Sequence, residues 1–201
     1  MKDALPSFDE AAQFHGHVCP GLAMGYRVAT KAMELLGVTR PRDEELVAVV
    51  ENDTCAVDAI QLVTGCTFGK GNLLFKDYGK GGFSFFAREK GKAYRISYRD
   101  FPTLPGDDGA RMEELKKKIH FEQSATEEER REYGTLRQKL IHHMLACPAE
   151  GLLKWTPLAA QPPKPARIRP SIVCEKCGEQ VMETRIRKVG GKNLCIPCAE
   201  Q

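Results

Sequence analysis

The chain has 201 residues, of which 42% are hydrophobic, and a formal net charge of +3. This length and composition allow one domain of ordinary size with a full hydrophobic core, and a second, smaller unit. No stretch reaches the roughly 18 uncharged apolar residues of a membrane span, the first residues lack the apolar segment of a secretory signal, and the charge is too small to indicate nucleic-acid binding. We therefore expect a soluble cytoplasmic protein whose eight cysteines are thiols and metal ligands.

Two helices are predicted near the amino terminus. Ser7 is suited to cap a short helix over residues 9–13, and Pro20 is suited to the first position of a longer helix that runs to Leu36 and ends at Gly37. The longer helix carries a stripe of small residues that permits close backbone approach, either within the core or to a second copy of the chain. The stripe consists of Gly25, Ala29 and Ala32.

Between these helices, three metal-capable side chains fall at alternate positions: His15, His17 and Cys19. Residues two apart point the same way in an extended backbone, so the three can converge on one point. Cys19 becomes the N-cap of the longer helix, where unpaired amides and the helix dipole favour its thiolate. The stretch indicates half of a metal or nucleophilic site. A buried cysteine between histidines that only make hydrogen bonds fits the same residues.

A second cysteine also lies at a helix start. Residues 46–50 form a short apolar run rich in β-branched valine, which predicts a buried strand. Asp53 or Thr54 is suited to cap a following helix that ends at Gly65. This arrangement gives Cys55 the same position as the first cysteine. The two thiols and the histidines together indicate a mononuclear metal site or a paired-thiol site.

The glycine-rich loop at residues 65–72 does not match a phosphate-binding P-loop. Only three residues separate its first glycine from the Gly-Lys pair, and the loop follows a predicted helix instead of a strand. Its glycines instead permit a close backbone approach around a site. Cys66 and Lys70 are candidate functional groups there, and a structural role fits them equally well.

From residue 72 onward, short apolar runs and alternation predict an antiparallel unit with one wet face and a turn at residues 89–92. The predicted strands cover residues 73–75, 82–88 and 93–98. The predicted helices cover residues 110–119 and 127–146, the second with a capping box of Thr126 and Glu129, and a last strand or docking segment covers residues 152–155. The pattern predicts an α+β fold, with helices on an antiparallel sheet.

A proline-rich linker at residues 157–170 is predicted to separate a core domain, residues 1–156, from a module at residues 171–201. Two Cys-x-x-Cys pairs in the module, seventeen residues apart, indicate one structural zinc site. Its ligands are Cys174, Cys177, Cys195 and Cys198. A disulfide or redox dithiol is the alternative, but so small a fragment needs a metal to fold.

Three motifs, at residues 14–25, 51–61 and 64–72, resemble one family. They are similar to the FmdE (FwdE) family, named for one of the subunits of the molybdenum or tungsten formylmethanofuran dehydrogenase. The four-cysteine module resembles the treble-clef zinc finger that some members carry. The resemblance implies an FwdE-like α+β core, a homodimer, and a groove that holds a second divalent metal, zinc or a similar cation.

Carried onto this chain, the resemblance makes His17, Cys19 and Cys55 the core metal ligands. It also brings His15, Cys66 and Lys70 close to the groove. The candidate catalytic residues are Cys19, Cys55, His15 and Lys70.

Two functions fit these observations. The first is a metal-dependent enzyme or accessory subunit in one-carbon redox metabolism, whose core metal keeps an open position for substrate. The second is a binding or regulatory protein whose finger contacts a partner while the core senses metal or redox state. Residues 161–201 carry a local charge of +4. This modest charge supports contact with a protein at least as well as contact with nucleic acid.

Overall fold

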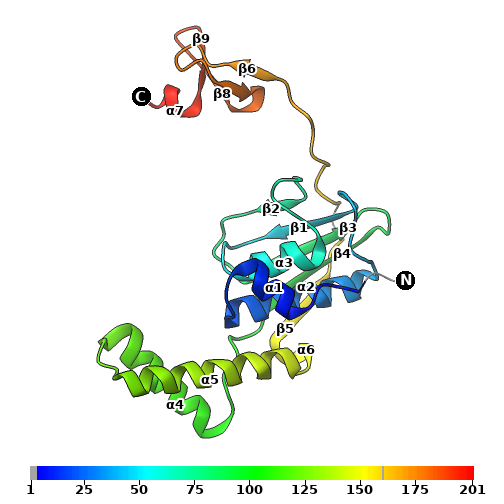
Figure 1. Ribbon diagram of the computed structural model, residues 1–201. Coiled ribbons are helices and arrows are strands. Elements are labelled where there is room, and N and C mark those ends of the chain that lie inside the picture. Colours follow the sequence, from blue (N-terminus) through cyan, green and yellow to red (C-terminus); the bar gives the residue numbers. More distant parts are fainter. Residues whose placement is uncertain (1–3, 160) are drawn as a thin grey trace. The chain divides into compact units, whose positions relative to one another are not determined.

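The computed structural model describes residues 4–159 and 161–201 of the chain, drawn in Figure 1. Residues 1–3, at the start of the predicted core domain, and residue 160, in the predicted linker, lie outside the described part. The chain forms two compact units, the first ending at Pro165 and the second running from Ala166 to Gln201. Within the described residues, no helix is long and apolar enough to cross a membrane.

The first unit combines helices with one sheet and confirms the predicted α+β class. Its elements in chain order are α1 (Phe8–His15), α2 (Pro20–Leu36), β1 (Leu46–Val50), α3 (Ala56–Thr64), β2 (Leu73–Phe75), β3 (Gly82–Ala87), β4 (Lys92–Tyr98), α4 (Gly106–Lys117), the π-helical turn η1 (Lys118–Glu122), α5 (Glu127–Ala146), α6 (Ala149–Leu152) and β5 (Leu153–Pro157).

The five strands of this unit pair in the order β2-β1-β3-β4-β5. Neighbours from β1 through β3 and β4 to β5 are antiparallel, but β2 runs parallel to β1, with Ala48 opposite Leu73. The prediction that β2 belongs to an antiparallel unit is therefore wrong. The helix α3 connects β1 to β2, and a helical crossover returns the chain in the same direction, which a tight hairpin cannot do.

Helices α2 and α3 pack against each other at Gly25. A Cβ atom built at this glycine lies only 2.3 Å from the carbonyl oxygen of Ala56, so any larger residue forces the helices apart. Ala29 and Ala32 continue the stripe and are fully buried in the main core. Of the two roles considered for these small residues, the structure shows packing within the chain.

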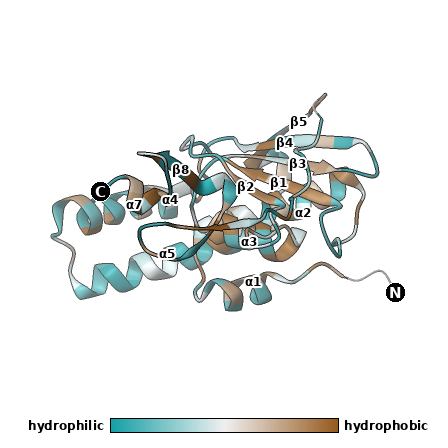
Figure 2. Cartoon of the chain, turned by 90° about the horizontal axis from the view of Figure 1, so that it is seen from above, coloured by the Kyte–Doolittle hydropathy of each residue, from teal (hydrophilic) through white to brown (hydrophobic). Residues whose placement is uncertain are grey.

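The main core lies between the sheet and the helices that cover it. Phe83 and Phe85 of β3 are fully buried there with Met24, Leu36 and Ile60. Figure 2 shows the corresponding brown, hydrophobic colour along the strands and along α2, whereas much of α5 is teal. The packed core therefore fixes the positions of α2 and α3.

Helices α4 and α5 form a pair that is stabilised by ion pairs. Nη2 of Arg111 lies 2.6 Å from Oε2 of Glu132, and Nζ of Lys118 lies 2.7 Å from Oε1 of Glu129. The predicted capping box at the start of α5 is confirmed, because Thr126 and Glu129 exchange both hydrogen bonds. We call residues 106–146, from α4 to α5, the helical arm.

The second unit consists of two antiparallel hairpins and a short helix. Its elements are β6 (Ser171–Val173), β7 (Gln180–Met182), the 3-10 turn η2 (Glu183–Arg185), β8 (Ile186–Val189), β9 (Lys192–Cys195) and α7 (Ile196–Ala199). Its buried apolar cluster consists of Cys174, Leu194 and Cys195. So little apolar burial cannot stabilise a fold of this length, so the unit needs a further cross-link.

Candidate metal centre

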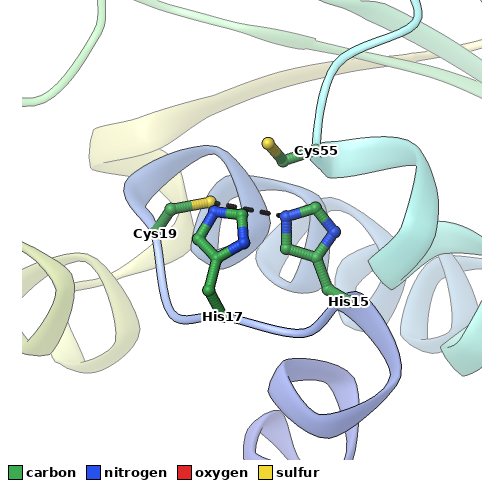
Figure 3. A group of neighbouring side chains, drawn as sticks. All are labelled: His15, His17, Cys19 and Cys55. Atoms are coloured by element: carbon green, nitrogen blue, oxygen red, sulfur yellow. Dashed lines mark hydrogen bonds between the residues drawn. The ribbon is translucent and has the colours of Figure 1, made fainter.

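The two predicted histidines and two predicted cysteines of the first unit converge. His15, His17, Cys19 and Cys55 each offer one ligand atom, and these four atoms lie within 4.8 Å of one another. Figure 3 shows both imidazole rings and both thiols turned toward a common point. The end of α1, the following loop, the start of α2 and the start of α3 supply one group each. We call these four residues the core cluster.

The loop between α1 and α2 brings the histidines together by a turn, so the prediction of an extended backbone is wrong. His15 is the last residue of α1, and Gly16 then reverses the chain with a φ of 92°. The turn brings the rings of His15 and His17 to 4.4 Å between centroids. Cys19 is the N-cap of α2 as predicted, and its Sγ accepts a hydrogen bond from the Leu22 N–H at 3.4 Å.

Cys55 is itself the N-cap residue of α3 and makes no side-chain cap hydrogen bond. The predicted cap by Asp53 or Thr54 is wrong, because the Asn52 side chain forms a local turn and accepts hydrogen bonds from the N–H and hydroxyl of Thr54. Burial and the neighbouring Cys19 thiol raise the pKa of the Cys55 thiol. At this helix start, loss of solvent therefore outweighs the expected stabilisation of the thiolate.

His15 has an acidic partner that reasoning from the sequence missed. Its Nδ1 lies 2.7 Å from Oδ2 of Asp58, and its Nε2 lies 3.9 Å from Sγ of Cys19. Asp58 follows Cys55 by three residues on α3, and that helical spacing was the available signal. A carboxylate on one ring nitrogen fixes the ring and leaves the other nitrogen free for a metal, as in many metal sites.

A pocket of about 520 Å³ opens beside the core cluster. On the cluster side it is lined by His17, Cys19 and Cys55, and by Gly21, which lies beside both sulfur atoms. A Cβ atom at Gly21 lies 3.9 Å from Sγ of Cys55 and 4.0 Å from Sγ of Cys19. The opposite wall comes from residues 101–104 and the helical arm, and includes Leu104, Met112, Lys116, His120, Tyr133 and Arg137.

Cys66 and Lys70 lie away from the core cluster. The Cys66 thiol is fully buried and donates a hydrogen bond to the Leu46 carbonyl at 3.4 Å, and burial raises its pKa to about 11. Nζ of Lys70 donates to the Asp43 carbonyl at 3.1 Å. The loop at residues 65–72 thus contacts the start of β1. Lys70 is therefore not part of the core cluster.

The four cysteines of the second unit form the other cluster. Cys174, Cys177, Cys195 and Cys198 bring their sulfur atoms within 4.8 Å of one another. The Sγ atoms of Cys177 and Cys195 are 3.9 Å apart, and the Cys195 N–H donates to Sγ of Cys174 at 3.3 Å. Backbone amides of Cys177, Cys195 and Lys176 lower the pKa of Cys174 to about 6. Four converging thiols are the donor set of a structural zinc site.

Two family models match the chain. Residues 14–154 match the family described as "FmdE, Molybdenum formylmethanofuran dehydrogenase operon". Residues 167–201 match the family described as "Prokaryotic dksA/traR C4-type zinc finger". The second description agrees with the four-thiol cluster, and the first match includes every residue of the core cluster.

Two proteins are similar over most of the chain. A "Probable S-adenosyl-L-methionine-binding protein" of Archaeoglobus fulgidus is 33% identical over 193 residues, which are 94% of this chain and 51% of that protein. The chain therefore spans about half the length of this relative. The crystal structure of a tungsten formylmethanofuran dehydrogenase FmdE-like protein from Syntrophus aciditrophicus matches with a TM-score of 0.58 and 23% identity, over 96% of this chain and 92% of that chain. Similarity at this identity concerns the fold.

Proposed function

Because the chain belongs to the FmdE family and ends in a C4-type zinc finger, we propose that its first unit holds a divalent cation at the core cluster, beside a substrate pocket. The observation that carries this proposal is the convergence of four ligand atoms, from three helices and a loop, within 4.8 Å. Two thiolates and two imidazoles suit zinc or a similar borderline-soft cation. Such a cation would supply Lewis acidity at the pocket.

Three of the four groups are the anchored ligands in this proposal. The Leu22 N–H holds Cys19, Asp58 orients His15, and α3 carries Cys55. His15 is thus a fourth ligand here, in addition to the three that were predicted from the sequence. The exposed His17 lines the pocket, so it would lie on the side where a catalytic metal site keeps one position open.

The activity that we propose is one-carbon redox chemistry, as an accessory subunit or stand-alone relative linked to formylmethanofuran dehydrogenase-type metabolism. Membership of the FmdE family supports it, and so does the pocket beside the core cluster. We do not extend S-adenosylmethionine binding to this chain, because that name describes a protein of which the chain matches about half the length.

The alternative function is a binding or regulatory role for the zinc finger. The second unit exposes apolar side chains at Val173, Met182 and Val189. Apolar groups on a small module suit contact with a protein better than contact with a phosphate backbone. In this alternative the core cluster acts as a metal or redox sensor.

We further propose a homodimer formed by the first unit, and a cytoplasmic location that keeps the thiols reduced. The first unit exposes large apolar side chains at Phe75, Phe101 and Phe121, which a second copy would cover. A chain ending at Pro165 should sediment as a dimer at micromolar concentration. A monomer would shift the interface to the finger or abolish it.

Metal analysis of protein purified without oxygen and without added metal tests the core site. The unaltered chain should contain two metal ions, and Cys19→Ser should contain one while keeping the finger zinc. Cys147→Ser is the matched control, because this half-buried thiol lies outside both clusters. An unchanged metal count in Cys19→Ser contradicts the proposal and leaves Cys19 as a buried capping residue.

A further inference from the structure

The far wall of the pocket carries a positively charged side chain that is not part of the proposed metal site. Arg137 of α5 is half-buried and lines the pocket. In the part of the chain that the structure describes, its guanidinium has no ion pair or hydrogen bond. Three other cations of the helical arm are paired: Arg111 with Glu132, Lys118 with Glu129, and Lys139 with Asp108. The arm thus neutralises these three charges and leaves Arg137 available at the pocket.

Apolar and aromatic side chains share this wall of the pocket with Arg137: Leu104, Met112, Tyr133 and Leu140. A charged group that loses water among such neighbours is destabilised unless a counter-charge meets it. The pocket therefore favours a ligand that has a negative group for Arg137 and an apolar body for the rest of the wall.

Two further polar residues of this wall, Lys116 and His120, already have partners within the protein. Nζ of Lys116 lies 3.3 Å from Oε2 of Glu113, so this lysine is already paired inside the pocket. His120 belongs to the π-helical turn η1 and meets the Tyr133 ring edge-on, with centroids 5.9 Å apart. Turns of this kind are frequent at functional sites. The guanidinium of Arg137 offers two parallel hydrogen bonds and one positive charge. A carboxylate balances this charge, whereas a phosphate monoester carries about −1.5 to −2 at pH 7 and would keep an excess negative charge.

We propose that the pocket binds a small carboxylic acid with an apolar or aromatic body, and that its carboxylate pairs with Arg137. The opposite end of the molecule then faces the core cluster across the pocket. This inference rests on the proposed function, since it names the substrate class of the same site. Arg137 is the specificity-determining residue for the acid, and the core cluster acts on the other end.

Calorimetric titration of the full chain tests this inference with phenylacetate, 3-phenylpropanoate and 4-phenylbutanoate, each against its primary amide. The three acids differ in the number of methylene groups between carboxylate and ring, and so sample different distances from Arg137 toward the core cluster. At least one acid should bind about 10-fold or more tightly than its amide, as expected for a charge-assisted hydrogen bond. Arg137→Gln should remove this preference and leave the affinity for the amide unchanged. Arg130→Gln, an exposed arginine of α5 outside the pocket, should preserve the preference.

The results separate this inference from the proposed metal site. Acids that bind no better than their amides, or a preference that survives in Arg137→Gln, overturn the carboxylate site even if Cys19→Ser loses the core metal. A preference that depends on Arg137, in a chain whose metal count Cys19→Ser does not change, supports the carboxylate site and removes the metal site alone.

Discussion

Nδ1 of His15 lies 2.7 Å from Oδ2 of Asp58, and Nε2 of the same ring faces Sγ of Cys19 at 3.9 Å. One nitrogen of the ring is therefore held from α3, and the other is directed into the core cluster. The carboxylate therefore fixes the orientation of the His15 ring.

Asp58→Asn should weaken metal binding at the core cluster by about 10–100-fold, because the amide lacks the charge that makes the imidazole a better ligand. Competition with a chromophoric chelator measures this affinity, with the finger zinc as an internal reference. Asp53→Asn, at an exposed position before α3, is the control and should have no effect. Equal losses in the two variants would show that His15 does not depend on Asp58.

Gly25→Ala should lower the free energy of unfolding by about 2 kcal/mol, because the new methyl group overlaps the backbone of α3 at Ala56. The start of α3 carries Cys55, so the same variant should also weaken the core metal site. Gly134→Ala in α5 has open space around the new Cβ atom and should raise stability by about 0.5–1 kcal/mol. Urea unfolding measures both, and equal stabilisation would mean that α2 and α3 are not in close contact.

Removal of zinc by a chelator should unfold residues 166–201 and leave the first unit folded, because the buried cluster of the second unit contains one residue besides two ligands. Amide NMR signals of this segment should collapse to random-coil positions. Dispersed signals from a zinc-free sample would mean that the thiols are not a structural metal site.

Acid should loosen the helical arm before the main core. Lys118, together with Thr126, holds the pKa of Glu129 at about 2, and Arg111 lowers the pKa values of Glu114 and Glu132. A lowered carboxyl pKa stabilises the fold above its unfolded value, roughly 4.3, and this contribution disappears as pH falls toward the folded value. The groups are near the surface, so the effect should be modest and should shrink in high salt.

Hydrogen exchange, corrected for intrinsic rates, should therefore show a loss of protection in the helical arm between about pH 4.5 and 2, with α2 unaffected over the upper part of this range. Arm protection that is constant down to pH 2 would contradict this role of the ion pairs.

The start of α5 and the end of α2 were predictable from the sequence because capping is local, whereas the start of α3 was not. Thr126 and Glu129 identify the start of α5, and Gly37 identifies the end of α2. The direction of β2 was not predictable from its three residues, since it depends on the crossover through α3. Local patterns determine elements, and pairing between distant segments determines the sheet.

The members of the core cluster were found by residue type and by position at helix ends. Asp58 was missed because an acidic residue in the first turn of a helix already has a local explanation, in the helix dipole. Its partner His15 lies 43 residues away in the sequence. Arg137 was missed for a similar reason, because an arginine in a charged helix carries no signal until the pocket is formed.

The core cluster and the far wall of the pocket come from separate parts of the chain. All four members of the cluster lie between residues 15 and 55, whereas the far wall comes from residues 101–104 and the helical arm. Substitutions, insertions or exchange of the arm can therefore alter the shape of the pocket without disturbing any residue of the core cluster. Descendants of one ancestral gene can keep the same four side chains and diverge in the pocket beside them, with α4 and α5 as the part that changes.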